Sequence, residues 1–275
     1  VNQGYYGEWE IVREYFPSTE LPALVELYQV INKGKNSLAV EIPKDGFIAQ
    51  TDPSKGVKGS YLIESKLLKD GCFTLQPGDT LCFSAFISAH DSETSSLVLD
   101  ACTEKVKRES LVASWMNNLV LETPDPVINQ MFAFSKIRAC ESIYETQGGP
   151  MHGPGGESYY AAIWANDQAE YINPYFPYIG YEYGNVSALN SFKHFARFIN
   201  DEWKPIPSSI VAEGLDIWAG VGDRGDAAMI AYGASRYALT RANREEAEEL
   251  WPLISWCLEY CHRKLNEGGV VASDT

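Results

Sequence analysis

The chain has 275 residues, of which 45% are hydrophobic and 21% are charged, so its composition excludes a disordered protein and allows one or two domains. Its formal net charge of -15 argues against nucleic acid, anionic membranes and polyanionic substrates as partners, because these bind basic surfaces. No stretch approaches the ~20 consecutive apolar residues of a membrane span.

Residues 1–110 consist of short runs rich in Val, Ile, Tyr and Phe, separated by turn residues. Turn signals recur at roughly the 8–12-residue spacing that is typical of a sandwich. This pattern predicts an N-terminal antiparallel β-sandwich. No polar cluster gathers in it, and we expect a stabilising or spacing role for this half. The turn signals lie at residues 32–34, 44–46, 69–71 and 76–78.

The pattern changes near residue 95, where a run that begins as another strand moves to helical periodicity. We expect residues 111–124 to be a linker. Asp125 and Pro126 then predict a helix start, with Asp125 as the N-cap and Pro126 at the first helical position. Residues 125–275 are predicted to form helical hairpins, which would be part of a larger helical domain.

Helices are expected at residues 185–201 and 226–239, where apolar residues recur at helical spacing. Asn243 is expected to cap a last helix, which Pro252 should divide or kink. Residues 268–275 resemble a loop that leads into another helix, so we expect the chain to be a fragment.

The stretch at residues 212–228 gathers carboxylates, an indole and a guanidinium in a glycine-bearing loop that leads into a helical pattern. Like charges destabilise each other at short range, so such crowding favours a functional loop. The alternative interpretation is a turn that only caps the following helix. The polar and aromatic residues concerned are Glu213, Asp216, Trp218, Asp223, Arg224 and Asp226.

A second acidic loop at residues 155–168 contains Glu157 and ends with Trp164 three residues before Asp167. A carboxylate beside an indole can accept hydrogen bonds from paired sugar hydroxyls while the ring packs on the apolar face of the sugar. The alternative is that Asn166 or Asp167 only caps the helix that begins there.

The order Trp-Ala-Asn-Asp-Gln at residues 164–168, followed by an aromatic segment that ends at Gly180, resembles the Trp-x-Arg-Asp motif of the six-hairpin glycosidases. These enzymes have an (α/α)6 toroid, and they include glucoamylases, trehalases, glycogen-debranching glucosidases and α-rhamnosidases. The resemblance implies that Asp167 anchors the terminal sugar; Asn166 stands where many members carry arginine. A β-rich front half followed by helical hairpins also matches the usual domain order of the family.

The loop at residues 222–227 resembles the debranching-type loop in which an Asp-Ala pair opens a helix. The aspartate of that pair is the general acid of the family, so the resemblance gives this role to Asp226. Residues 213–216 also resemble the Glu-Ser-Gly-Trp-Asp acid motif of trehalases with one residue missing, which makes Asp216 the rival. The family's base comes from a late helix of the toroid, so it is expected beyond Thr275.

The resemblance implies an inverting glycoside hydrolase whose partner is a neutral oligosaccharide or glycoside, and no cofactor is expected. Acetal cleavage requires a protonated carboxylic acid and an ionised carboxylate that activates water, roughly 6.5–9.5 Å apart in inverting enzymes. In this hypothesis Asp226 is the acid, and Asp167 and Trp164 hold the non-reducing sugar. Further residues expected at the pocket are Glu157, Glu213, Trp218, Asp223 and Arg224.

Two other functions remain open at this point. Polysaccharide lyases also combine helical toroids with β-sandwiches, and His152 and Tyr159 are candidates for proton abstraction, although the acidic balance speaks against a uronate substrate. A non-catalytic carbohydrate-binding or scaffold protein on the same fold is also compatible, because no credible base is visible.

Metal binding is not expected, because the four histidines at positions 90, 152, 194 and 262 lack ligand-like spacing. The six cysteines also lack metal-ligand spacing, and Cys257 and Cys261, one helical turn apart, are expected to be free thiols. They do not fix the redox compartment; a periplasmic or secreted location is expected ahead of a cytoplasmic one.

Overall fold

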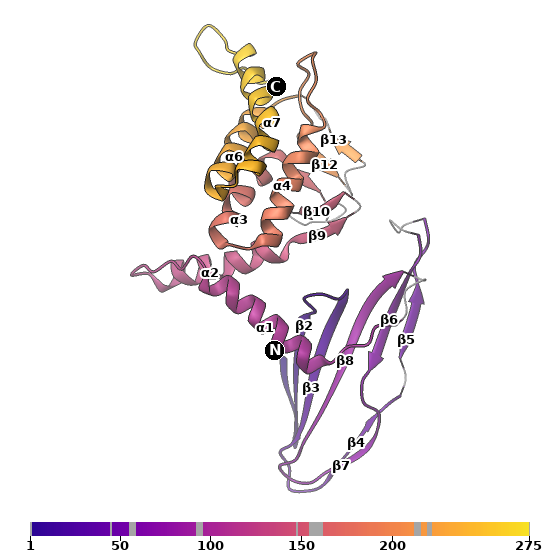
Figure 1. The fold of residues 1–275 in the computed structure, drawn as a ribbon. Coiled ribbons are helices and arrows are strands. Elements are labelled where there is room, and N and C mark those ends of the chain that lie inside the picture. Colours follow the sequence, from indigo (N-terminus) through magenta and orange to yellow (C-terminus); the bar gives the residue numbers. More distant parts are fainter. Residues whose placement is uncertain are drawn as a thin grey trace. The chain divides into compact units, whose positions relative to one another are not determined.

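The computed structural model describes residues 2–44, 46–54, 59–91, 96–146, 148–153, 162–211, 216–218 and 222–274. For residues 2, 5, 211 and 216–218 it describes the backbone alone. The chain divides into two compact units, residues 1–113 and 114–275 (Figure 1). We describe each unit by itself.

The first unit is built on a six-stranded antiparallel sheet with the strand order β1-β2-β3-β8-β6-β5. Its centre is the long pair β3 and β8, which are joined in register from Ala23↔Ser88 to Ile31↔Thr80. The strands of this unit are β1 (Asn2–Tyr6), β2 (Trp9–Pro17), β3 (Ala23–Asn32), β4 (Leu38–Ile42), β5 (Phe47–Gln50), β6 (Tyr61–Leu67), β7 (Gly71–Leu75) and β8 (Thr80–Asp91).

A second, two-stranded sheet of β4 and β7 packs against part of the larger sheet. Ile42 and Leu75 from this small sheet form one buried cluster with Val30 and Leu81 from β3 and β8. Burial of these apolar side chains between the two sheets supplies the main hydrophobic stabilisation there. The predicted antiparallel β-layered front half is therefore confirmed.

Helix α1 (Ala101–Asn117) follows the sheet, and it corrects two expectations. The residues before it, 96–100, form no strand, and residues 111–117 of the expected linker are helical. The start of α1 packs on the sheet because Ala101 is buried with Phe16 and Val25. Lys105 also forms a 2.7 Å ion pair with Glu14 on β2.

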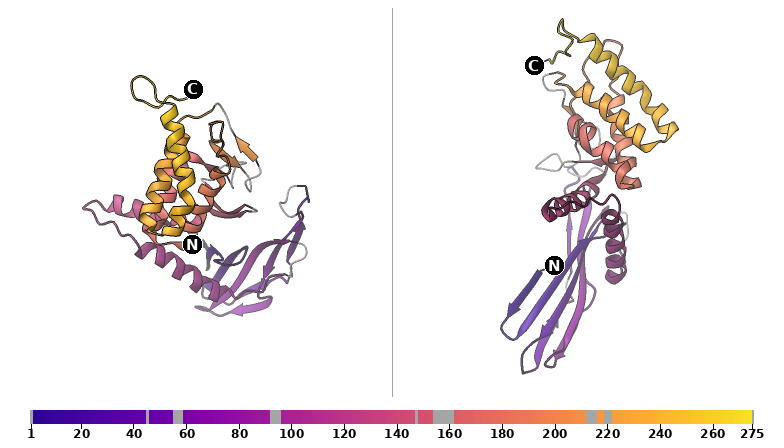
Figure 2. Two further views of the ribbon diagram at one scale, coloured as in Figure 1. Left: turned by 45° about the horizontal axis from the view of Figure 1, so that its top comes forward. Right: turned by 90° about the vertical axis from the view of Figure 1, so that its left-hand side faces the viewer.

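The second unit is mainly helical, as the sequence predicted, and Figure 2 shows α6 and α7 as an antiparallel pair. Its helices are α2 (Pro126–Glu141), the π-helix η1 (Asp167–Ile172), α3 (Asn173–Ile179), α4 (Glu182–Ala196), α6 (Asp226–Arg241) and α7 (Arg244–Arg263). Its strands are β9 (Ile143–Thr146), β10 (Gly149–His152), β11 (Ile163–Trp164), β12 (Ser209–Val211) and β13 (Asp216–Trp218).

The helix boundaries follow local capping chemistry. Asp125 caps α2 by accepting a 2.8 Å hydrogen bond from the Val127 amide, which confirms the predicted start. Asn243 caps α7 in the same way, accepting from the amides of Glu245 and Glu246. Helix α7 runs continuously through Pro252 as a single element. Helix α4 begins three residues before the predicted start and ends at Ala196.

Helix α6 lies very close to η1, and glycine makes this approach possible. A Cβ atom placed on Gly233 would lie 2.6 Å from the backbone carbonyl carbon of Ala169, and closer still to its oxygen. One turn further along α6, the Arg236 guanidinium donates to the Glu170 carbonyl at 3.3 Å. The segment that carries Asp167 is therefore fixed directly against the helix that begins at Asp226.

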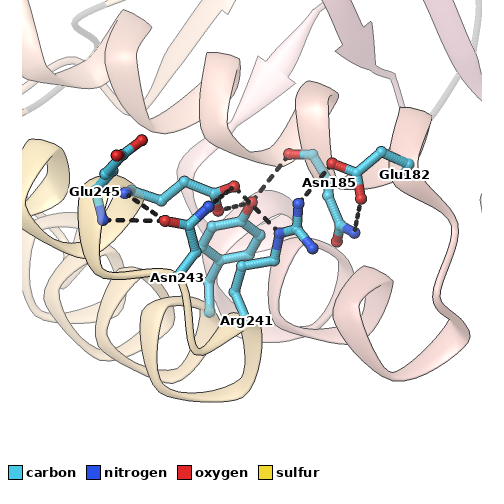
Figure 3. A network of polar contacts seen from close by, with 7 residues as sticks. Glu182, Asn185, Arg241, Asn243 and Glu245 are labelled. Carbon is cyan, nitrogen blue, oxygen red and sulfur yellow. Dashed lines mark hydrogen bonds and ion pairs between the residues drawn. The ribbon is translucent and has the colours of Figure 1, made fainter.

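A polar network joins α4 to the α6–α7 turn (Figure 3). Arg241 pairs with Glu182 on α4 and, at 3.2 Å, with Glu246 on α7. The Tyr237 hydroxyl donates to Glu246 at 2.9 Å, and its burial raises the pKa of this phenol. These charge-assisted bonds fix the relative position of three helices around the hydrophobic core.

The end of α1 is held by a buried lysine from α2. The Lys136 ammonium donates to the carbonyl oxygens of Met116, Asn118 and Leu119 at 2.8, 2.7 and 3.3 Å. The carbonyls of Met116 and Asn118 are among those that the end of a helix leaves without partners, and a cation complements the negative end of the helix dipole. Burial lowers the pKa of Lys136.

Candidate functional site

A small three-stranded antiparallel sheet joins the two acidic loops that the sequence singles out. Strand β11 precedes Asp167 by three residues, and β13 lies between residues 212–215 and the loop that leads to Asp226. The two strands lie on either side of β12. Segments about 50 residues apart in the sequence are thus held two strands apart, about 10 Å by ordinary strand spacing.

The register of this sheet places two predicted residues in one row. Trp164 pairs with Ser209, and Ser209 pairs with Trp218. In the neighbouring row Ile163 and Ile210 are fully buried. Successive residues of a strand point to opposite faces of the sheet. The Trp164 side chain therefore projects from the face opposite to the buried side chains of Ile163 and Ile210. Trp164 is half-buried.

Asp167 begins the π-helix η1, and its carboxylate accepts a hydrogen bond from the Tyr171 hydroxyl. The N-cap residue Asn166 has helical dihedral angles, and its side chain makes no capping bond. The interpretation as a simple cap is therefore wrong for Asn166. Because π-helices are rare and occur frequently at functional sites, η1 is a notable location for the predicted sugar anchor.

Asp226 is the first residue of α6 and is 6% exposed. Burial and the neighbouring carboxylate of Asp223 raise the pKa of Asp226 above its ordinary value. The Arg224 amide and side-chain charge oppose this shift, but the amide lies at a long 3.5 Å. The site thus favours a protonated carboxylic acid at this position.

Asp223, which is 2% exposed, has a different task from Asp226. Its carboxylate accepts hydrogen bonds from the amides of Gly225 and Ala227 at 3.3 and 3.2 Å. Gly225 has a φ of +114°, a left-handed conformation that glycine adopts without strain. The capping interpretation of this acidic stretch is therefore confirmed for Asp223, whose carboxylate stabilises the start of α6.

Sequence reasoning missed the residues that hold Asp223 in place. The Asp223 amide donates to the Asp274 carboxylate at 2.9 Å, and the Asp274 amide donates back to the Asp223 carbonyl at 2.8 Å. Lys264 pairs with Asp274 and lowers the pKa of that carboxyl group. No local sequence pattern indicates this pair of hydrogen bonds, because Asp223 and Asp274 are about 50 residues apart in the sequence.

The remaining predicted residues are placed in part. Glu157 and Glu213 lie outside the described residues. Asp216 and Trp218 lie on β13, where the backbone alone is described. Arg224 lies in the loop between Asp223 and α6.

Asp167 also lines a pocket between α2, β10 and the η1–α3 segment, together with Arg138, His152 and Tyr175. Asp226 is absent from the described lining of this pocket. Sequence reasoning did not connect Arg138 or Tyr175 with Asp167, since Arg138 reads as an exposed residue in the last turn of a helix.

The described part of the chain contains no group of three or more His, Cys, Asp and Glu side chains arranged to bind a metal ion. None of its helices combines the length and the hydropathy needed to cross a membrane.

Comparisons with known proteins indicate the fold. No family model and no curated protein matches the sequence. A protein from the human microbiome, provisionally described as a kojibiose phosphorylase, superposes with a TM-score of 0.58 at 7% identity over 84% of this chain and 39% of its own. A bacterial glucoamylase, solved in complex with acarbose, aligns over 94% of this chain and 55% of its own, with 9% identity and a TM-score of 0.35.

The phosphorylase comparison shows a shared fold and confirms the arrangement of an antiparallel sheet followed by helices. This chain spans about two fifths of the length of that phosphorylase.

Proposed function

We propose that this chain forms the acid-bearing and sugar-binding part of an inverting glycoside hydrolase of the six-hairpin type. The observation that carries the proposal is the environment of Asp226, a buried carboxyl group beside Asp223 at the first turn of α6. The fold shared with a protein described as a kojibiose phosphorylase supports a carbohydrate as the class of substrate.

The pKa of Asp226 is shifted in the direction that a general acid requires. Such a group must retain its proton until the leaving oxygen needs it, and burial beside a second carboxylate is a common way of raising the pKa. Asp223 accepts hydrogen bonds from two amides, and its carboxylate adds to the effect of burial in raising the pKa of Asp226. Asp226 then donates this proton to the glycosidic oxygen as the bond from that oxygen to the anomeric carbon breaks.

Trp164 and Asp167 are the proposed sugar contacts. They are three residues apart, at the end of β11 and the start of η1, so both are close to the small sheet that leads to the α6 loop. The indole supplies a flat apolar face, and the Asp167 carboxylate retains acceptor capacity beyond the bond from Tyr171. This arrangement suits a pyranose ring with one apolar face and a hydroxyl-bearing edge.

In hydrolysis, the attacking oxygen belongs to a water molecule that approaches the anomeric carbon from the face opposite to the leaving group, and an ionised carboxylate acting as general base takes the proton of that water. One carbon–oxygen bond forms as the other breaks, and the configuration of the sugar is inverted. Phosphorolysis is the second candidate, because the solved structure that shares the fold is described as a phosphorylase. In that reaction an oxygen of inorganic phosphate attacks, and the product is a sugar 1-phosphate.

The test of the acid uses two substrates with different leaving groups. In full-length protein, D226N is expected to lose roughly 10²–10⁴-fold in kcat/KM on an unactivated disaccharide, and much less on a 2,4-dinitrophenyl glycoside, whose leaving group needs no proton. D216N serves as the matched comparison, because Asp216 is the rival acid. Equal activity of D226N and wild type on the disaccharide would refute the role of Asp226, and selective loss in D216N would transfer it to Asp216.

The reaction class is decided by the product. Proton NMR of the first-formed sugar gives its anomeric configuration, and assays with and without inorganic phosphate separate hydrolysis from phosphorolysis. Retention of configuration would contradict the inverting mechanism. A product that absorbs in the near ultraviolet would instead indicate a lyase, and saturable sugar binding without turnover would indicate a binding protein.

A further inference from the structure

The pocket that contains Asp167 has a volume of about 480 Å³, within the roughly 300–1,000 Å³ of typical small-ligand sites. It lies wholly in the helical unit. Its polar lining comes from Ser135, Arg138, Ser142, His152, Asp167, Tyr171 and Tyr175.

We propose that this pocket binds one neutral pyranose unit, and that Arg138, His152 and Tyr175 determine which sugar it accepts. The proposal rests on the proposed function for the class of ligand, and it extends the site to residues on α2, β10 and α3 that lie outside the acidic loops. It assigns no chemical step to these residues.

Two polar groups in the lining lack partners among the described residues. The Nδ1 atom of His152 and the hydroxyl of Tyr175 are buried and have no hydrogen-bond partner. His152 is 8% exposed as a whole. Leaving such a group unpaired costs about 1–3 kcal/mol, so a site that holds two of them is poised to gain hydrogen bonds from a ligand.

The charge of the lining favours a neutral ligand. Burial lowers the pKa of His152 to about 4, so its ring is neutral at pH 7 and offers one donor and one acceptor. The remaining charged lining residues are Arg138 and Asp167, one cation and one anion. A sugar hydroxyl can accept from a guanidinium and donate to a carboxylate, whereas an anionic ligand would meet repulsion from Asp167.

The π-helical geometry of η1 presents the acceptor to the pocket. Asp167, Tyr171 and Ile172 stand at positions i, i+4 and i+5, which fall on one face when the helix closes i→i+5 bonds, and all three line the pocket. The hydrogen bond from Tyr171 fixes the Asp167 carboxylate. On the facing wall Arg138 is exposed, and its guanidinium has no recorded partner in the described part of the chain.

The test measures sugar binding directly and needs no turnover. D-glucose, D-galactose and D-mannose, with D-glucuronate as the anionic probe, are titrated to about 100 mM against the wild-type protein by saturation-transfer NMR. We expect saturable binding of at least one neutral hexose, weakened at least tenfold by R138A and by H152F, since loss of a hydrogen bond to a charged or buried partner has this effect.

R244A is the matched control, because Arg244 is an exposed arginine of α7 that pairs only with Glu248 among the described contacts, and it should bind like wild type. If H152F fails to fold, R138A still tests the proposal, because Arg138 is exposed and its replacement should leave the fold intact. Absence of neutral-hexose binding, stronger binding of D-glucuronate, or equal affinity in R138A and wild type would overturn the proposal.

The two proposals fail separately. D226N should retain the hexose affinity of wild type, because Asp226 is not among the described lining residues. Binding without an effect of D226N on turnover would remove the proposed acid and leave the pocket intact. If Asp226 is essential for turnover but the R138A and H152F variants bind hexose normally, only the proposal for the pocket is refuted.

Discussion

Replacement of Gly233 by alanine tests whether the two proposed halves of the site depend on one close helix contact. Gly233 faces the backbone of Ala169 on η1, and a Cβ there would lie 2.6 Å from the Ala169 carbonyl carbon. An ordinary contact begins near 3.4 Å and the Ala169 oxygen lies closer than the carbon, so α6 and η1 must separate by more than about 0.8 Å. The obstructing atoms belong to backbone, so no side-chain rotation can relieve the clash.

The expected sign is opposite to that of an ordinary substitution. Glycine to alanine within a helix normally stabilises by about 1 kcal/mol, because glycine loses more backbone entropy on folding. Overpacking normally costs about 1–3 kcal/mol, and a collision between two backbones should reach the upper end. We therefore expect G233A to lose about 2 kcal/mol net, or about 4–8 °C in Tm for a unit of this size.

The effect on activity should exceed the effect on stability. Asp167 begins η1 and Asp226 begins α6, so separating the two helices moves the proposed sugar anchor relative to the proposed acid. Misplacement by about 1 Å costs on the order of 10²-fold in rate. The measurements are urea unfolding followed by helical circular dichroism, and kcat/KM at a temperature where the variant is folded.

Leu239, which is 81% exposed on the same helix, gives the control L239A, expected within about 0.5 kcal/mol of wild type. A G233A variant that is more stable than wild type by the usual helix-propensity gain would show that α6 and η1 do not touch at this point.

Two further predictions concern stability. K136M should lose about 2–4 kcal/mol of unfolding free energy in urea, because three carbonyls lose a charged donor. The control K193M removes a half-exposed surface ion pair and should lose less than about 1 kcal/mol. Equal losses in the two variants would refute the capping role of Lys136. The raised pKa of Asp226 means that the folded state holds an extra proton between the ordinary pKa and the raised one, so this residue's contribution to stability falls as pH rises through that window. D226N should remove that component of the slope in thermal melts across acidic pH, and an unchanged slope would show that Asp226 titrates normally.

Much of the fold is predictable from local chemistry. The turn spacing of the front half, the Asp125 cap and the Asn243 cap each depend on a few neighbouring residues, and each is found in the structure. Helical periodicity after residue 95 is visible in the sequence, but the bounds of α1 are not, because its apolar residues follow a β-like run; residues 111–117 were expected to belong to a linker. Local patterns do not show where such a segment changes conformation.

The site was less predictable, because its geometry depends on contacts between distant segments. The pairing of β11 with β12 and β13 brings the Trp164 loop and the Asp226 loop together, and no spacing in the sequence encodes that pairing. The contact of Asp274 with Asp223 and the pocket that Arg138 and Asp167 both line have the same origin. The sequence identified the acidic loops but could not separate a capping carboxylate from a chemical one.

The difference between the environments of Asp223 and Asp226 is the main argument for Asp226 as the proposed general acid. Asp223 and Asp226 have the same side chain, lie three residues apart and are both buried. The Asp223 carboxylate accepts from two amides at 3.3 and 3.2 Å, whereas the Arg224 amide lies 3.5 Å from the Asp226 carboxylate. Bonds to a carboxylate stabilise its ionised form, whereas burial without such bonds stabilises the protonated form. The fixed negative charge of Asp223 then adds to the effect on its neighbour. Asp223, which the sequence suggested only as a further pocket residue, thus caps the start of α6 and contributes to the raised pKa of Asp226.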